Sequence, residues 1–343
     1  MADQNNANNR IVVKIARSKH PRTPRLPAPP MHVTASTNDL VEDLQSTNLY
    51  ARFKDKAPKL TAGQVEAYLK ANGRKASSLL AAYRTSGDLA LLKEAMEKYP
   101  NDPQVAFEAV YAKDLSPEQQ RQWLNTFEQS APDNALANYL SALNYFNSGQ
   151  IDQGVQELTA ASGKQQFQDY TLDRWKDDEE AYLSAGYSAA EAEYLSMSQL
   201  ALPQLAPIKQ LGQDLVDLAN TYSQSGDQAS AQAALQMAVN LGQRYVSSSA
   251  GEAVLDQLVG LAVERMVLSA MDPNSLYGDN GQTVQDQLNQ LAQQRAALKA
   301  SVQQAGSLLE TMSDQDWINY TDRWMIFGEL AANQWLVNKY GQN

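Results

Sequence analysis

The stretch that decides the fold is ALANYLSALNYFNSGQIDQGVQELTAA, residues 135–161. Bulky Tyr139, Tyr145 and Leu158 recur at helical intervals, with small alanines between them. Because helical side chains three and four residues apart share one face, the stretch predicts two short amphipathic helices. Gly149 lies between the two runs and can adopt the left-handed conformation that ends a helix, so a tight turn is expected there.

This pattern resembles a tetratricopeptide repeat (TPR). The small residue of that family falls on Ala142, its tyrosine on Tyr145, its turn glycine on Gly149 and its closing alanine on Ala161. Gly154 stands where the family usually has alanine. The resemblance implies antiparallel helix pairs that stack on one another, each pair held close by its small residues.

The signature Tyr-x-x-x-Gly recurs four times. It comprises Tyr83 with Gly87, Tyr145 with Gly149, Tyr182 with Gly186, and Tyr222 with Gly226. The glycines are 62, 37 and 40 residues apart, and the first interval has room for a glycine-free unit built on Val105–Ala112 and Trp123–Phe127. The family period is near 34 residues. Around Tyr222, Ala219 and Ala238 also stand in family positions. We expect the four tyrosines in equivalent buried positions.

We therefore predict an all-α fold: a TPR-like, right-handed α-solenoid of stacked antiparallel helix pairs with extra C-terminal helices. Residues 1–38 form a basic, proline-rich arm, 39–246 the TPR-like repeats and 247–343 a C-terminal helical cap. Strand signals are almost absent. Five helix starts carry capping pairs, in which side chains satisfy free amides of the first turn. They are Thr61 with Gln64, Ser116 with Gln119, Ser188 with Glu191, Thr283 with Asp286, and Ser313 with Asp316.

The composition argues against an enzyme. The 343-residue chain has no cysteine, and its two histidines, His20 and His32, both lie in the arm. Cysteine nucleophiles and thiolate metal sites are excluded, and the usual general base near neutral pH is missing from the rest of the chain. No Gly-rich phosphate loop or Ser-His-Asp set occurs there. We expect no catalytic residue, no cofactor and no metal.

The densest acidic cluster is KDDEE at residues 176–180. Carboxylates at helical spacing could hold calcium or magnesium through their oxygens, but the glycine-punctuated loop typical of such sites is missing. Tyr182 follows in helical register, so a solvated helix face is the preferred interpretation.

Charge is divided unevenly along the chain. Residues 1–30 carry six basic residues and one acid, a net +5, whereas the remainder carries 22 basic and 38 acidic residues, a net −16. An acidic body repels phosphates, so nucleic acid is not an expected partner. No apolar run approaches the roughly 20 residues that span a bilayer, so we expect no membrane span.

The sequence leaves two alternatives for the cellular compartment of the protein. Residues 130–145 are also similar to bacterial helical-repeat proteins that often begin with a membrane anchor or an export signal. No such segment is recognised here, so the cytoplasm is the default expectation and an extracytoplasmic location is the alternative.

The arm has prolines at every third position, 21, 24, 27 and 30, which is the period of a polyproline II helix. Such a segment cannot bury enough apolar surface to fold alone. It is either a solvated tail or an extended ligand for a groove, in this molecule or another. In the second case Arg17, Arg22 and Arg25 are candidate partner-binding residues.

A stripe of aromatic residues marks the C-terminus. Trp317, Trp324 and Trp335 are separated by 7 and 11 residues, so on one continuous helix they fall within about 20° of a single line. Tyr320 falls near the same line. The stripe is either the core of a helix that closes the solenoid, or an aromatic groove for a peptide or the arm.

Two functions from different classes follow. The first is an adaptor or scaffold whose concave helical face binds a protein or peptide. The second is a structural subunit that assembles with copies of itself into a filament or ring through its basic arm. A head-to-tail contact between copies gives a ring if the rotation closes and a filament if it does not.

Overall fold

The structure is a computed structural model that describes residues 48–54, 57–246, 253–278 and 281–341. All of these residues belong to one unit, residues 44–343. The other unit, residues 1–43, lies outside the described residues, and so do the proline-rich arm (1–38) and the first residues of the predicted repeats, 39–47. The described part of the chain is predominantly helical, which confirms the all-α prediction.

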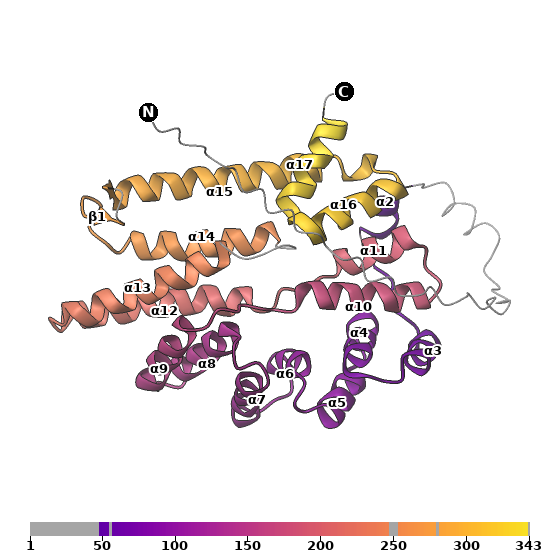
Figure 1. Ribbon diagram of the computed structural model, residues 1–343, viewed down its shortest axis with the longest axis horizontal. Coiled ribbons are helices and arrows are strands. Elements are labelled where there is room, and N and C mark those ends of the chain that lie inside the picture. Colours follow the sequence, from indigo (N-terminus) through magenta and orange to yellow (C-terminus); the bar gives the residue numbers. More distant parts are fainter. Residues whose placement is uncertain (1–47, 55–56, 247–252, 279–280, 342–343) are drawn as a thin grey trace, which may run out of the picture. The chain divides into compact units, whose positions relative to one another are not determined.

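Short helices make up the first part of the described chain. They are α2 (Leu49–Phe53), α3 (Ala62–Asn72), α4 (Ala76–Ser86), α5 (Leu89–Lys98), α6 (Pro103–Val110), α7 (Pro117–Ser130), α8 (Ala135–Asn147) and α9 (Ile151–Ser162). From α3 to α9, each helix packs on the next one along the chain. Helices α3 to α9 form the lower row of helices in Figure 1, whereas α2 lies beside α11 (Ala189–Ser198).

Longer helices follow. They are α10 (Thr171–Ser184), α11 (Ala189–Ser198), α12 (Leu205–Gln224), α13 (Gln228–Val246), α14 (Val254–Leu268), α15 (Val284–Gly306), α16 (Asp314–Phe327) and α17 (Glu329–Tyr340), with a 3-10 turn η1 (Leu309–Thr311) before α16. Between α14 and α15 a short antiparallel hairpin pairs β1 (Leu276–Tyr277) with β2 (Gln282–Thr283), so that Leu276 lies opposite Thr283.

Several of the longer helices pack back on the short ones. Helix α10 lies across α4 and also contacts α3, and α12 packs on α8 (Figure 1). We call α4, α6 and α8 the inner helices. In a simple stack each repeat contacts only its neighbours, whereas here the inner helices are joined to α10 and α12 by contacts between residues far apart in the sequence.

The capping signals correctly located five helix starts. Thr61, Ser116, Ser188 and Thr283 each form a complete capping box. Ser313 also caps its helix by accepting the Asp316 N–H, while the carboxylate of Asp316 accepts hydrogen bonds from Lys339 and Tyr340 of α17. The capping residues thus accept hydrogen bonds from backbone N–H groups of the first helical turn, which have no partner within the helix.

The four signature glycines have the expected left-handed backbone. Their φ angles are 78° at Gly87, 73° at Gly149, 96° at Gly186 and 85° at Gly226. In three of the turns the carbonyl of the signature tyrosine accepts the N–H of the residue after the glycine, at 2.9, 3.2 and 2.9 Å. At Gly87 it accepts the glycine N–H itself, at 2.7 Å. The carbonyl of the signature tyrosine thus accepts a hydrogen bond that ends each helix, and the left-handed glycine forms the turn.

The tyrosine side chains are not equivalent, so that prediction was wrong. Only Tyr182 is fully buried, and its hydroxyl donates to the Pro58 carbonyl at 3.2 Å. Tyr83, Tyr145 and Tyr222 are half-buried. Tyr145 lies beneath the guanidinium of Arg121, whose Cζ is 4.5 Å from the ring centroid. The small residues of the signature, Ala142, Ala161, Ala219 and Ala238, are all buried.

Close helix approach also depends on glycine in α13 and α14. A Cβ added to Gly260 would lie 2.7 Å from the Gly242 carbonyl oxygen, and one added to Gly242 would lie 3.0 Å from the Gly260 carbonyl oxygen. Neither helix could approach the other as closely with larger residues at this crossing. None of the helices in the described ranges combines the length and apolar character that crossing a bilayer requires.

Candidate functional site

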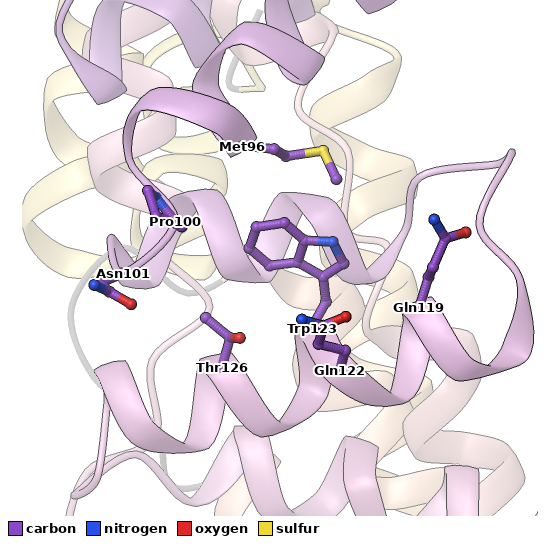
Figure 2. A pocket seen from close by; sticks show the side chains of 7 residues that line it. All are labelled: Met96, Pro100, Asn101, Gln119, Gln122, Trp123 and Thr126. Carbon is purple, nitrogen blue, oxygen red and sulfur yellow. The ribbon is translucent and has the colours of Figure 1, made fainter.

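A groove of about 320 Å³ lies between the end of α5 and helix α7. We call it the α5–α7 groove. Its apolar part comprises Met96, Pro100 and the half-buried Trp123, whose indole lies at the centre of the close view with Met96 beside it (Figure 2). An exposed indole face is a large and rigid contact surface, because it buries much area while losing little rotational freedom. This part of the groove is therefore suited to hold an apolar side chain.

Polar side chains complete the lining of the α5–α7 groove. They are Asn101, Gln119, Gln122 and Thr126, and Figure 2 shows Asn101 and Gln119 at opposite ends of the groove. The side-chain oxygen Oε1 of Gln119 accepts the Ser116 N–H at 2.9 Å as part of the α7 capping box. Among the described residues, no hydrogen bond uses the side-chain amide nitrogens, Asn101 Nδ2, Gln119 Nε2 and Gln122 Nε2. Three amide groups can thus donate to a ligand in the groove.

No ionised side chain lines the α5–α7 groove, but acids stand beside it. Glu118 is exposed and lies one helical turn before Gln122 on α7. Hydrogen bonds from its own backbone N–H and from Ser116 lower the pKa of Glu118, so its carboxylate is charged at neutral pH. Glu97, next to Met96, is also exposed. The α7 side of the groove therefore carries a negative charge at Glu118, whereas on the α5 side Glu97 is accompanied by the exposed Lys93, one helical turn before Met96.

The inner helices carry a different polar assembly, which we call the inner-face network. It joins Arg84 of α4 and Glu108 of α6 to Arg174 and Asp178 of α10. The Arg84 Nε donates to both Asp178 carboxylate oxygens, at 2.8 and 3.1 Å, and Arg84 also donates to Glu108 at 3.1 Å. Arg174 Nε donates to the same Glu108 oxygen at 3.0 Å. Each of these side chains is at most 10 % exposed.

This network explains how α10 is held on the inner helices. Two guanidinium groups face two carboxylates, so the charges balance within a buried site. Burial alone would lower the pKa of Arg84, but the carboxylates of Asp178 and Glu108 outweigh it and raise the pKa. The arginine therefore stays charged and paired. The inner face is closed at this point by the chain's own α10.

The same contacts correct the interpretation of residues 176–180. Asp178 is buried and paired with Arg84, so it is neither solvated nor free to bind a cation. Lys176 and Glu180 are exposed, as the solvated-face interpretation required. Within the described ranges, no group of three or more His, Cys, Asp or Glu side chains is placed to hold a metal ion.

The C-terminal aromatic stripe does not lie on one helix. Gly328, with φ 86° and ψ 161°, separates α16 from α17, and that backbone conformation is accessible essentially to glycine alone. Trp317 and Trp324 lie on α16 and Trp335 on α17. The expectation that the three tryptophans lie on one continuous helix was therefore wrong.

Most of these aromatic residues belong to a buried ladder. Trp317 packs edge-on against Tyr194 of α11 with ring centroids 4.7 Å apart, and Trp324 packs against Trp175 of α10 at 5.2 Å. Tyr320 lies between the two tryptophans and is buried, as is Trp317. This contact surface joins α16 to α10 and α11. Trp335 stands apart, half-buried under the Arg323 guanidinium at 4.6 Å.

Sequence reasoning missed the α5–α7 groove. It placed Trp123 in a glycine-free repeat unit but assigned it no binding role. The available signal was a single tryptophan inside the polar run PEQQRQWLNTFEQS of α7. The arginines expected to bind a partner, Arg17, Arg22 and Arg25, lie outside the described residues.

The chain was also compared with known proteins. No protein-family model, no curated protein and no solved structure matches it.

Proposed function

We propose that this chain is a non-enzymatic helical-repeat protein that binds a protein or peptide as an adaptor or scaffold. The pairs α4–α5, α6–α7, α8–α9, α10–α11 and α12–α13 are its TPR-like units in a right-handed solenoid, with α14 to α17 as a cap. Contacts within each of these pairs support the assignment. So do the left-handed glycines at four of the five turns.

The binding surface in this proposal is the α5–α7 groove. The observation that carries it is the half-buried Trp123, which stands among three amide groups that have no other donor role in the described part of the chain. An aromatic anchor with a polar rim is the chemistry that dominates recognition energies at protein interfaces. The helices that form the groove are the second members of their pairs and face away from α10.

The concave face of the proposed solenoid is less suited to bind a ligand than the α5–α7 groove. In the proposal the inner helices would line that face, but Arg84 and Glu108 already pair with Asp178 and Arg174 of α10. A ligand would have to displace these buried pairs and leave charges without partners. An outer groove requires no such rearrangement.

Selection from a phage library of random dodecapeptides tests the proposal. The full-length protein should enrich clones whose binding is lost with Trp123→Ala and weakened with Gln122→Ala. Gln236→Ala removes an exposed amide on α13, away from the groove, and should leave binding unchanged. Clones that bind all three variants equally would place recognition elsewhere, and failure to enrich any clone would count against peptide binding.

The division of charge favours a second candidate function. With +5 on residues 1–30 and −16 on the remainder, copies of the chain can attract one another head to tail. We propose self-assembly into a filament or ring as this alternative. Light scattering after size-exclusion chromatography should then show a mass that falls on deletion of residues 1–30 and on raising the salt concentration. A monomer at low salt and high protein concentration would rule the alternative out.

A further inference from the structure

We propose that the α5–α7 groove binds an extended, proline-rich peptide from another polypeptide chain, with a proline on Trp123 and a basic residue beside Glu118. The inference rests on the proposed peptide-binding function and names the class of its ligand. It follows from the chemistry of the lining, the length of the groove and the charge at its edge.

The lining matches the hydrogen-bonding needs of such a peptide. A polyproline II segment has no internal hydrogen bonds, and its prolines offer carbonyl acceptors but no N–H donors. It therefore needs a surface that donates. Asn101, Gln119 and Gln122 carry amide groups whose nitrogens have no partner among the described residues, and they surround an indole against which a proline ring can pack. Aromatic-lined grooves are how proline-rich segments are commonly recognised.

The length of the groove agrees with one polyproline turn. Its lining on α7 runs from Gln119 to Thr126, which at 1.5 Å per residue corresponds to about 10 Å along the helix axis. Polyproline II rises about 3.1 Å per residue and repeats every three residues, so successive prolines of a P-x-x-P segment stand about 9 Å apart. One such segment is thus about as long as the groove, so a proline on Trp123 leaves room for the neighbouring residues of the segment on either side.

The α7 side of the groove selects the charge of the ligand. Glu118 stands one turn before Gln122 and is exposed, whereas on the α5 side Glu97 is offset by the exposed Lys93. The Glu118 carboxylate favours an arginine between the prolines over an acidic residue. A strongly basic, proline-rich peptide also suits the negative charge of the remainder of the chain.

The decapeptide PRTPRLPAPP, residues 21–30 of this sequence, has this chemistry and is a suitable probe. Fluorescence anisotropy of the labelled peptide would be measured with a protein that lacks residues 1–30, so that the protein carries no copy of the probe. Binding should weaken at least roughly tenfold with Trp123→Ala, as for an aromatic anchor, and severalfold with Gln122→Ala. Gln122 is exposed, so its variant tests the groove even if Trp123→Ala unfolds the protein. Gln236→Ala is the matched control.

A second peptide, with alanine in place of every proline, keeps both arginines and separates the two proposals. The proline-rich inference predicts that this peptide binds at least roughly tenfold more weakly. Equal binding of both peptides, still lost with Trp123→Ala, would overturn the inference and leave peptide binding in the groove intact. Binding of the probe that responds to salt but to none of the groove variants would show nonspecific attraction to an acidic protein and overturn the inference. So would no measurable binding of the probe at millimolar concentration.

Discussion

Arg84 of α4 donates to both carboxylate oxygens of Asp178 of α10, at 2.8 and 3.1 Å, across 94 residues of sequence. Both side chains are at most 10 % exposed. Both of these hydrogen bonds come from Arg84 Nε, and Arg84 Nη2 also lies 2.8 Å from Asp178 Oδ1. Because two guanidinium nitrogens face the carboxylate, the contact restricts the angle as well as the distance between the helices. The pair thus positions α10 on α4 and, with Glu108 and Arg174, buries these charges between α4, α6 and α10.

Removing one partner of this pair should be costly. Asp178→Ala leaves the Arg84 guanidinium buried with one carboxylate fewer, and we expect a loss of roughly 3–5 kcal/mol in the free energy of unfolding, as for other broken buried ion pairs. Denaturation by urea measures the change. Glu94 pairs with Lys98 at 2.7 Å on an exposed surface, so Lys98→Ala is the matched control and should cost less than about 1 kcal/mol. Equal losses in the two variants would refute the role assigned to Asp178.

Glu193 of α11 should make stability depend on pH. Burial, followed by the negative charges of Glu179 and Asp322, raises the pKa of Glu193 to about 8, and the Thr321 hydroxyl donates to its carboxylate. In the folded state Glu193 therefore keeps its proton up to a higher pH, whereas in the unfolded state it releases the proton near the ordinary pKa of a glutamate. The resulting stabilisation is complete below that unfolded value and is lost as pH rises through about 8.

Glu193→Gln tests this dependence. The amide keeps the shape of the neutral carboxyl and cannot ionise, so the variant should gain stability relative to the unsubstituted protein as pH rises from about 5 to about 8. Melting temperatures of the two proteins, measured in parallel across that range, give the difference. Glu97→Gln is an exposed control that should show no such trend. Parallel curves for the Glu193 variant and the unsubstituted protein would mean that Glu193 is ionised in the fold at neutral pH.

Local features of the fold could be predicted from the sequence, whereas contacts over long distances could not. The capping residue Thr61 acts on an amide three residues away, and Gly149 ends a helix through its own backbone, so both features follow from short sequence patterns. The partner of Asp178 is 94 residues away. A run of acidic residues does not indicate which carboxylate will be buried, because burial depends on residues distant in the sequence.

The candidate site was hidden for the same reason. Trp123 belongs to a helix whose pattern predicts only one apolar face, and the groove exists because Pro100 and Met96 approach from a separate helix and its following turn. For the aromatic stripe, the sequence instead predicted a shared surface that the structure does not form. Trp317 and Trp335 share a line only if the helix continues, and the backbone of Gly328 ends it between them. A single glycine in a helical pattern does not reveal which conformation it will adopt.

The signature tyrosines should differ in their contributions to stability. Tyr182→Ala removes a fully buried ring and should cost roughly 3–5 kcal/mol, as for other buried aromatic residues. Tyr145→Ala removes a half-buried ring and its cation–π contact with Arg121. We expect this variant to lose about 1–2 kcal/mol of unfolding free energy. Urea denaturation of both variants makes the comparison. A larger loss for Tyr145→Ala than for Tyr182→Ala would contradict the burial described for the two residues.

Substitutions at Gly149 should follow the cost of a left-handed backbone. Its φ is 73°, and no atom lies within 4 Å of an added Cβ, so backbone strain is isolated from any clash. Gly149→Ala should lose about 1–2 kcal/mol of unfolding free energy, and Gly149→Asn less, because asparagine visits this conformation more readily than other residues with a side chain. Gly63 is the matched control, because it lies in α3 with ordinary helical backbone and equally open surroundings. Gly63→Ala should gain up to about 0.5 kcal/mol through the higher helix propensity of alanine. A gain at both glycines in urea denaturation would show that the α8–α9 turn does not require a left-handed residue.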